Sequence, residues 1–309
     1  MTAIIAPPRL ANHRVILLDV LRVLLALLIL LYHSIIHLHC DYGIMNVVLI
    51  RQTIPMTLFF VLSGYSLQMT YGAKFEGEGM SVKVFYAKRL AAIWPLYMVC
   101  TILAIIMNVG AGNQTISDNL FLMPVEILGL QSVFPGSLFN YASNSGTWFV
   151  SCLFVSYALY PVLARIVNRI VSRNWLPLLG LILLWFYFSG ITRRFDVQFM
   201  YTNPMMRLLE FLIGMVLANN LTLRSTQVTP LLKPLVYFSN LSLALFLGQG
   251  FIILPLKYCI KYNIFPFELS NIQLIMVVIV FAYIVAILLH EAVEMPSKRF
   301  LNKKLSIVR

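Results

Sequence analysis

The chain has 309 residues, of which 60% are hydrophobic and 11% are charged, and its mean hydropathy is +0.86. Soluble globular proteins carry about 25% charged residues, so most apolar side chains of this chain must face lipid. The net charge of +12 does not indicate a nucleic-acid partner, because the basic residues lie between apolar stretches and form no runs interleaved with loop aromatics. The four cysteines stand singly, without the spacing of a metal site or disulfide scaffold.

Eight apolar stretches approach the ~20 residues that a helix needs to cross a bilayer. In chain order they are Val15–Leu38, Gln52–Tyr71, Leu90–Val109, Thr147–Val167, Trp175–Ile191, Pro204–Asn219, Leu235–Leu256 and Asn271–His290. The first is too long for the apolar core of a signal peptide and carries charges in its first turns, so we expect it to stay uncleaved. We therefore predict an all-α fold, a polytopic membrane helix bundle of about 8–10 spans, as a single domain over residues 1–309.

A shorter apolar segment, Leu120–Phe134, contains Pro124 and Glu126 and has no basic residue in its flanking loops. We interpret it as re-entrant or interfacial; the alternative is a ninth crossing, which would need a tenth near Thr229–Phe238. Placing the N-terminus in the cytosol puts most of the 23 basic residues on the cytosolic side, as the positive-inside rule requires. Both termini are then expected to be cytosolic.

The first span contains two pairs of ionisable residues, which are functional candidates because charge inside a bilayer is costly. Asp19 and Arg22 lie three residues apart on one helix face, and His33 and His37 lie four apart nearer the outer end. The first pair has an alternative explanation as an interfacial ion pair that starts the helix. The histidines have two alternatives, either solvation by headgroups or metal ligation, although a HExxH-type general-base Glu is absent.

Read with their neighbours, these residues belong to a series of ordered blocks. The blocks are LDVLR at 18–22 with Tyr32-His33, LFFVLSGY at 58–65, FYAKR at 85–89 with IWPLY at 93–97, Trp148 with Ser151, Tyr157 and Pro161, Arg207 with Glu210, Phe211 and Gly214, SNLSLALFL at 239–247, and EMP at 294–296. Their order and spacing resemble those of the membrane-bound acyltransferase family three over nearly the whole chain. Three positions depart from the family pattern: Ala92 replaces an Arg, Leu153 a Glu and Gln249 a His.

The resemblance implies an acyl-CoA-dependent O-acyltransferase that moves an acyl group, expected to be acetyl, from acetyl-CoA or another acyl-CoA to a hydroxyl of a cell-surface polysaccharide or glycolipid. An alcohol needs a general base within hydrogen-bond reach to attack a thioester. His33 stands where the family has its intramembrane histidine and is the predicted base, with His37 as the substitute. Asp19 lies ~21 Å from His33 along the helix, so Glu126 and Glu210 are the candidate carboxylates that orient it.

The donor's phosphates require cations near the cytosolic side, for which we select Arg22, Lys88 and Arg89, with Asp19 beside Arg22. Without the resemblance, Lys88 and Arg89 would be interpreted as ordinary basic residues that follow the positive-inside rule. Pro95 is expected to kink the third span and open a cavity beside it. Candidate residues of that substrate cavity are Ser63, Trp94, Trp148 and Arg207.

Two other functional classes fit the composition. A transporter or flippase for a lipid-linked sugar or small solute would need no acyl chemistry, and the departures at Ala92 and Leu153 favour it. A haem- or metal-binding electron carrier would use His33 and His37. The acyltransferase interpretation predicts a multi-pass protein of the bacterial inner membrane, with no metal, no nucleic-acid partner and a possible homo-oligomeric state.

Overall fold

The computed structural model describes residues 13–75, 79–134, 146–170, 174–192, 201–221, 223–264 and 269–307. These residues are almost entirely helical, and two two-residue strands, β1 (His13–Arg14) and β2 (Thr226–Gln227), pair antiparallel. The helices are α1 Ile16–Leu38, α2 Asn46–Leu49, α3 Thr53–Tyr71, α4 Val82–Gly110, α5 Ile116–Leu128, α6 Thr147–Ile170, α7 Leu176–Thr192, α9 Pro204–Asn220, α10 Lys233–Asn240, α11 Ser242–Gly248, α12 Gly250–Lys261, α13 Asn271–Leu289 and α14 Met295–Ile307. The prediction of an all-α membrane helix bundle is confirmed.

Each of the eight expected spans coincides with one helix or, in one case, with consecutive helices. Within the described ranges, five helical segments are long and apolar enough to cross a membrane: Ile16–Leu38, Val82–Gly110, Thr147–Ile170, Pro230–Gly248 and Asn271–Phe300. A sixth forms if Gly43–Leu49 and Thr53–Phe75, which meet at 51°, are one bent span. Because α7 and α9 have only 17 residues each, the count of eight spans stays a prediction.

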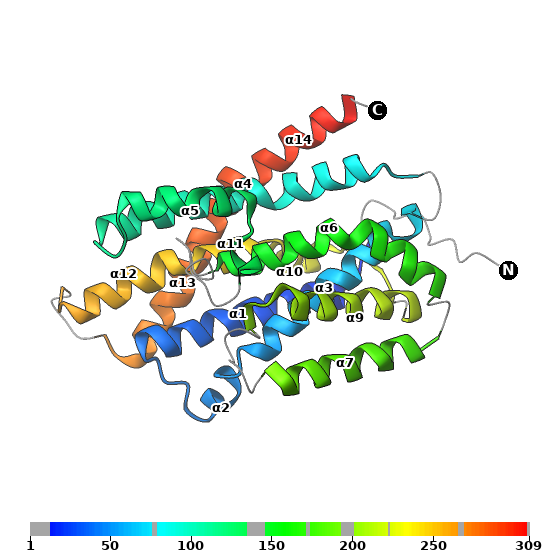
Figure 1. Ribbon diagram of the computed structural model, residues 1–309. Coiled ribbons are helices and arrows are strands. Elements are labelled where there is room, and N and C mark those ends of the chain that lie inside the picture. The colour runs from blue at the N-terminus through cyan, green and yellow to red at the C-terminus, as the bar shows by residue number, and fades with distance from the viewer. Residues whose placement is uncertain are drawn as a thin grey trace.

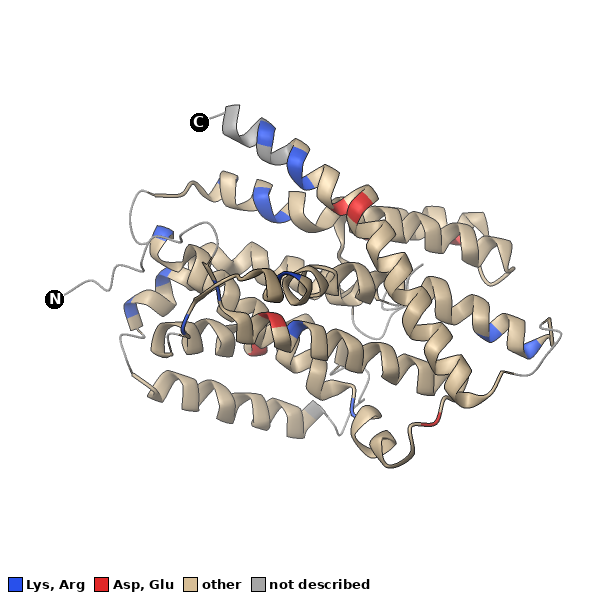
Figure 2. Cartoon of the chain, turned by 180° about the vertical axis from the view of Figure 1, so that it is seen from behind, with Lys and Arg blue, Asp and Glu red and all other residues tan. Residues whose placement is uncertain are grey.

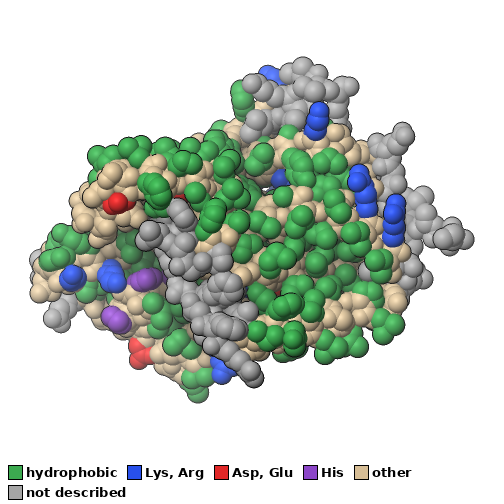
Figure 3. All heavy atoms as spheres, viewed as in Figure 1, with side chains coloured by type: hydrophobic (Ala, Val, Ile, Leu, Met, Phe, Trp, Pro, Cys, Tyr) green, Lys and Arg blue, Asp and Glu red, His purple; other side chains and the backbone are tan. Residues whose placement is uncertain are grey.

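The helices alternate in direction, which brings their ends together in two groups (Figure 1). The starts of α1, α4 and α7 lie at the right-hand end with the ends of α3, α6 and α9. Many lysines and arginines gather toward this same end, which is on the left in the reverse view of Figure 2. Hydrophobic side chains cover most of the face between the two ends (Figure 3). We call the right-hand end of Figure 1 the basic end; it corresponds to the side that the sequence predicts to be cytosolic.

Helices α3 and α9 cross at two glycines that allow their backbones to touch. A Cβ atom on Gly64 would lie 1.9 Å from the Phe211 carbonyl oxygen, and one on Gly214 would lie 1.9 Å from the Val61 carbonyl oxygen. Small residues allow this close approach, which supplies packing where lipid removes the hydrophobic drive for helix association. Both glycines belong to the sequence blocks described above, and the crossing explains why those blocks contain glycine.

The short segment after α4 forms α5, which runs back beside the second half of α4. Its first turn is closed by a capping box between Thr115 and Asp118. At its other end, the Trp94 indole Nε1 donates to the Ile127 carbonyl at 3.0 Å, so α5 stops beside the middle of α4. With 13 residues, α5 is shorter than the ~20 that a crossing needs, which favours the re-entrant or interfacial interpretation; its place in the membrane stays a prediction.

The expected span Leu235–Leu256 is divided into α10, α11 and α12. The breaks fall at Leu241 and Gln249. Gly248 precedes the second break and lies against α13, where an added Cβ would come within 2.8 Å of Leu289 Cδ1. The region near Thr229–Phe238 forms the start of this broken segment, in Pro230–Leu232 and α10, and not a separate span.

The third span begins earlier than expected, because α4 extends from Val82 and continues through Pro95 as one element. Lys88 and Arg89 therefore lie inside the helix, about two turns from its start. After α13, a π-helical turn at His290–Glu294 leads into α14. There His290 Nδ1 lies 2.8 Å from Glu294 Oε2, and Glu294 also accepts from Lys298.

Candidate active site

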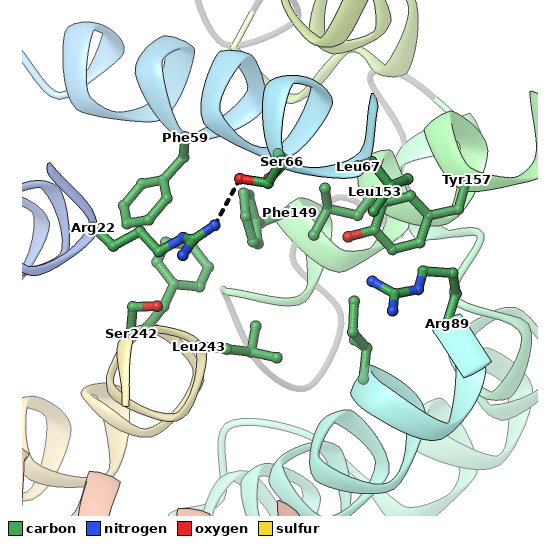
Figure 4. Close-up of a pocket in the computed structure, with 13 residues that line it drawn as sticks. Arg22, Phe59, Ser66, Leu67, Arg89, Phe149, Leu153, Tyr157, Ser242 and Leu243 are labelled. Atoms are coloured by element: carbon green, nitrogen blue, oxygen red, sulfur yellow. Dashed lines mark hydrogen bonds between the residues drawn. The ribbon is translucent and has the colours of Figure 1, made fainter. Parts of the chain in front are cut away.

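A cavity of about 210 Å³ lies inside the bundle between α1, α3, α4, α6 and α11. Ordinary ligand pockets measure about 300–1,000 Å³, so this cavity can enclose only part of a large ligand. Figure 4 draws the side chains that form its wall. They are Arg22, Phe59, Ser63, Ser66, Leu67, Arg89, Ile93, Phe149, Leu153, Tyr157, Ser242, Leu243 and Phe246.

The part of the cavity nearer the basic end is polar and cationic. Arg22 donates from Nη2 to Ser66 Oγ at 2.7 Å and from Nη1 to Asp19 Oδ1 at 3.4 Å. Arg89 donates from Nη2 to Tyr71 Oη at 2.8 Å, and its Cζ lies 5.0 Å from the centre of the Tyr71 ring. Arg89 Nε is buried with no hydrogen-bond partner among the described residues. Arg89 therefore has a donor left for an anionic ligand.

Tyr157 completes this polar part. Its side chain comes from α6 and points into the cavity on the side of Arg89 (Figure 4). Ser63 and Ser242 contribute hydroxyl groups from α3 and α11. The combination of two guanidinium groups with several hydroxyls is suited to phosphate or amide oxygens, which accept hydrogen bonds from both.

Asp19 pairs with the Arg22 guanidinium and helps to fix its position. Its carboxylate is 1% exposed, accepts from Ser239 Oγ at 2.7 Å, and pairs with both Arg22 and Arg14. Buried carboxylates require such partners. Asp19 does not line the cavity, so its geometry is that of a residue that positions Arg22.

Further from the basic end, phenyl groups from three helices line the cavity. Phe149 on α6 lies 6.2 Å from Phe59 on α3 and 4.8 Å from Phe246 on α11, measured between ring centres. All three side chains are buried. We call Phe59, Phe149 and Phe246 the phenyl layer.

His33 lies on the same face of α1 as Arg22, nearer the end of that helix. The separation of eleven residues is close to three helical turns, and the stripe between them passes through the buried Ala26 and Ile29. His33 and His37 stack with ring centres 5.6 Å apart and 2° between the ring planes, and Tyr32 meets His33 edge-on at 5.2 Å. The helix therefore directs His33 and Arg22 toward the same side at different depths.

Arg207 and Glu210 form a separate buried centre on α9. Arg207 Nη1 lies 2.7 Å from Glu210 Oε2, and both side chains are 2% exposed. Glu210 Oε1 accepts from Thr57 Oγ1 at 2.7 Å and from Trp185 Nε1 at 3.1 Å. The Arg207 Cζ lies 5.7 Å from the centre of the Trp148 ring. This pair is fully bonded, as a buried ion pair must be to offset its desolvation.

Glu126 and Trp94 belong to the contact between α4 and α5. Glu126 is 1% exposed and its carbonyl accepts from the hydroxyl of Tyr97. Trp94 is 39% exposed and bonds to α5 as described. Neither residue lines the cavity.

The structure therefore brings Arg22, Arg89 and Ser63 together at one cavity. Lys88, Trp94, Trp148 and Arg207 lie outside its lining, as do the carboxylates of Asp19, Glu126 and Glu210. The described contacts of Glu210 join it to Arg207 and not to His33, so its role beside His33 stays a prediction. In the described part of the chain, no group of three or more His, Cys, Asp or Glu side chains is arranged to hold a metal ion.

Several lining residues were not selected from the sequence. Tyr157 was present as a position in the Trp148 block, and Leu153 as a departure from that block, but neither was assigned to the cavity. Ser66 and Phe149 stood outside the sequence blocks, and Phe59 and Phe246 stood within two of them, at 58–65 and 239–247, without being assigned to the cavity. Leu153 now has a location: the position where the resembled family has Glu lies in the cavity wall.

Comparison with known proteins assigns the chain to a family. Residues 15–234 match the sequence model described as "Acyltransferase domain", of acyltransferase family 3. The chain is also 27% identical over 183 residues to acyltransferase MdmB of Streptomyces mycarofaciens, which covers 54% of this chain and 46% of that protein. The chain thus matches less than half the length of this relative. No solved structure matches.

Proposed function

The chain belongs to acyltransferase family 3, and we propose that it is an integral membrane enzyme that transfers an acyl group to a hydroxyl. The donor is a coenzyme A thioester, with acetyl as the acyl group. The acceptor is a hydroxyl of a cell-surface polysaccharide or glycolipid, the membrane is the bacterial inner membrane, and the reaction requires no metal. Family membership supports acyl transfer, and the finer assignments rest on the arguments below.

The observation that carries the proposal is the alignment of Arg22, the cavity and His33 along one face of α1. The cations at the basic end suit the phosphates of the donor, because guanidinium groups bind phosphate oxygens with short, charge-assisted hydrogen bonds. Arg89 has an unused Nε donor for this purpose. The cavity is too small for a whole acyl-CoA, so the nucleotide lies toward the basic end and the pantetheine arm extends inward.

The spacing along the helices is compatible with reaction at the phenyl layer. Arg22 on α1 bonds to Ser66 on α3, so these two residues mark one level in the bundle. From that level, Phe59 is seven residues along α3, or ~10 Å, and His33 is eleven residues along α1, or ~16 Å. His33 is therefore ~6 Å further along the bundle axis than Phe59. A hydroxyl oxygen about 3 Å from its base and about 3–3.5 Å from the carbonyl carbon spans that difference.

The chemistry then follows in two steps. The acceptor hydroxyl gives its proton to the His33 imidazole while its oxygen bonds to the thioester carbonyl carbon. The tetrahedral intermediate expels the coenzyme A sulfur by breaking the C–S bond, and the proton on His33 passes to that sulfur. The products are the O-acyl ester and free coenzyme A thiol, and His33 is neutral again.

The direct test is to incubate the detergent-purified chain with acetyl-CoA labelled in the acetyl group. Transfer to an added surface-glycan extract, or slow hydrolysis with release of thiol, is the expected result. A protein that binds the glycan but leaves the thioester intact would contradict the proposal and favour the transporter alternative, which needs no covalent chemistry.

A further inference from the structure

The phenyl layer suggests what limits the acyl chain of the donor. We infer that the phenyl layer receives the acyl group of the donor and restricts it to short chains, with Phe246 as a specificity-determining residue. This inference rests on the proposed function, because it assumes an acyl-CoA in the cavity. It adds a residue set and a selection rule that family membership does not supply.

The polarity of the wall gives the donor one orientation. Along α3, Phe59 lies seven residues further from the basic end than Ser66, and along α6, Phe149 lies eight residues further than Tyr157, so both rings lie ~10–12 Å deeper than these polar groups. Between them the wall is formed mostly by aliphatic side chains, including Ile93, Leu153 and Leu243. A donor held by its phosphates at the basic end therefore presents its acyl end to the phenyl layer.

The rings of the layer pack against one another. The Phe149 ring centre lies 6.2 Å from that of Phe59, 4.8 Å from that of Phe246 and 5.0 Å from that of Phe60. Protein interiors are close-packed, so a chain longer than the remaining space would have to displace these rings. The acyl group touches the layer only if it is short enough to fit.

Phe246 is the ring whose removal disturbs the bundle least. Phe149 has ring contacts with Phe59, Phe60, Trp148 and Phe246, whereas the described ring contact of Phe246 is with Phe149 alone. It lies on the seven-residue helix α11, between the two breaks in the seventh span. Truncating it should lengthen the cavity at the acyl end without touching Arg22 or Arg89.

The test compares kcat/KM for acetyl-CoA and butyryl-CoA in the full chain purified in detergent, with thiol release as the readout. In a hydrophobic pocket one methylene changes selectivity by about 10–200-fold. The wild type is expected to prefer acetyl-CoA, and Phe246→Ala should raise the butyryl-to-acetyl ratio at least about tenfold. Phe246→Leu should produce a smaller increase in the same direction.

The matched control is Phe238→Ala, because Phe238 lies on α10 in the same broken segment and packs on Tyr283, away from the cavity. Its ratio should equal that of the wild type. An unchanged ratio in Phe246→Ala with acetyl-CoA turnover retained would overturn the inference while leaving the proposed function in place. If Phe246→Ala does not fold, the same comparison is made with Phe246→Leu: an unchanged butyryl-to-acetyl ratio with acetyl-CoA turnover retained would overturn the inference. A wild type that turns over no acyl-CoA would overturn the proposed function and this inference together.

Discussion

At the scale of single residues, the main question is which histidine is the base. His33 shares its helix face with Arg22, while its neighbour His37 is one turn further out and stacks on it. General-base catalysis contributes about 10²–10⁴-fold, so His33→Ala should lose at least about 100-fold in acyl transfer while keeping donor affinity. His37→Ala is the matched control and should lose far less. Near-normal acyl transfer by His33→Ala would contradict the assignment of His33 as the base. Loss of transfer in His37→Ala instead would assign the base to His37, one turn further along α1.

The donor cations allow a second residue-scale prediction. Arg89→Ala removes a partly buried guanidinium whose Nε donor has no partner among the described residues, so acetyl-CoA binding should weaken by about 1.5–3 kcal/mol, the range for hydrogen bonds to charged groups. Isothermal calorimetry on purified protein measures this directly. Lys83→Ala removes the same charge from an exposed site near the start of α4 and should leave affinity unchanged. Equal affinity in both variants would make Arg89 an ordinary positive-inside anchor.

Part of this site follows from the sequence and part does not. Arg22 and His33 could be selected because three turns of a single helix fix their common face. Tyr157 and Phe246 could not, because the cavity is formed where five helices meet and no spacing within one helix encodes that meeting. Trp94 was selected for its place beside Pro95, yet its indole faces α5, where a carbonyl at the end of that helix accepts its hydrogen.

At the scale of elements, the crossing of α3 and α9 depends on two glycines. In Gly214→Ala the new methyl group would meet a backbone oxygen of Val61, which cannot rotate away. Overpacking of this kind costs about 1–3 kcal/mol or more, so the variant should show a clearly lower thermal unfolding midpoint in detergent. Gly190→Ala is the matched control, since its helical position is exposed and has nothing within 4 Å of the new Cβ. Equal midpoints would show that the helices separate without cost.

The positions of the helices were largely predictable from hydropathy, but their interruptions were not. The mean hydropathy of Leu235–Leu256 predicts a single span, although Ser239-Asn240 and Gly248-Gln249-Gly250 stand at its two breaks. Gly248 lies against Leu289 of α13, a contact made only in the folded bundle. Similarly, nothing in the apolar run of α13 indicates the π-helical turn that follows, where His290, Glu294 and Lys298 bond to one another.

At the scale of the whole molecule, charge and chain direction give the same orientation. The basic end carries the start of α1 and the end of α14, and the positive-inside rule assigns such an end to the cytosol. The proposed mechanism needs this orientation, because the donor cations lie toward that end and His33 toward the other. A reversed protein would present its cations to the wrong compartment for coenzyme A.

Impermeant thiol labelling of whole cells tests that orientation. Cys40 follows α1 but is only 3% exposed, so it is a poor reporter. Asn113, exposed after α4, and Ser225, exposed after α9, lie at opposite ends of the bundle. In a background with the four native cysteines replaced by alanine, Asn113→Cys should react in intact cells. Ser225→Cys should react only after permeabilisation, because an impermeant reagent cannot reach the cytosolic face. The reverse pattern would place His33 in the cytosol and separate it from any extracytoplasmic acceptor, leaving an acyltransferase that could act only on a cytosolic hydroxyl.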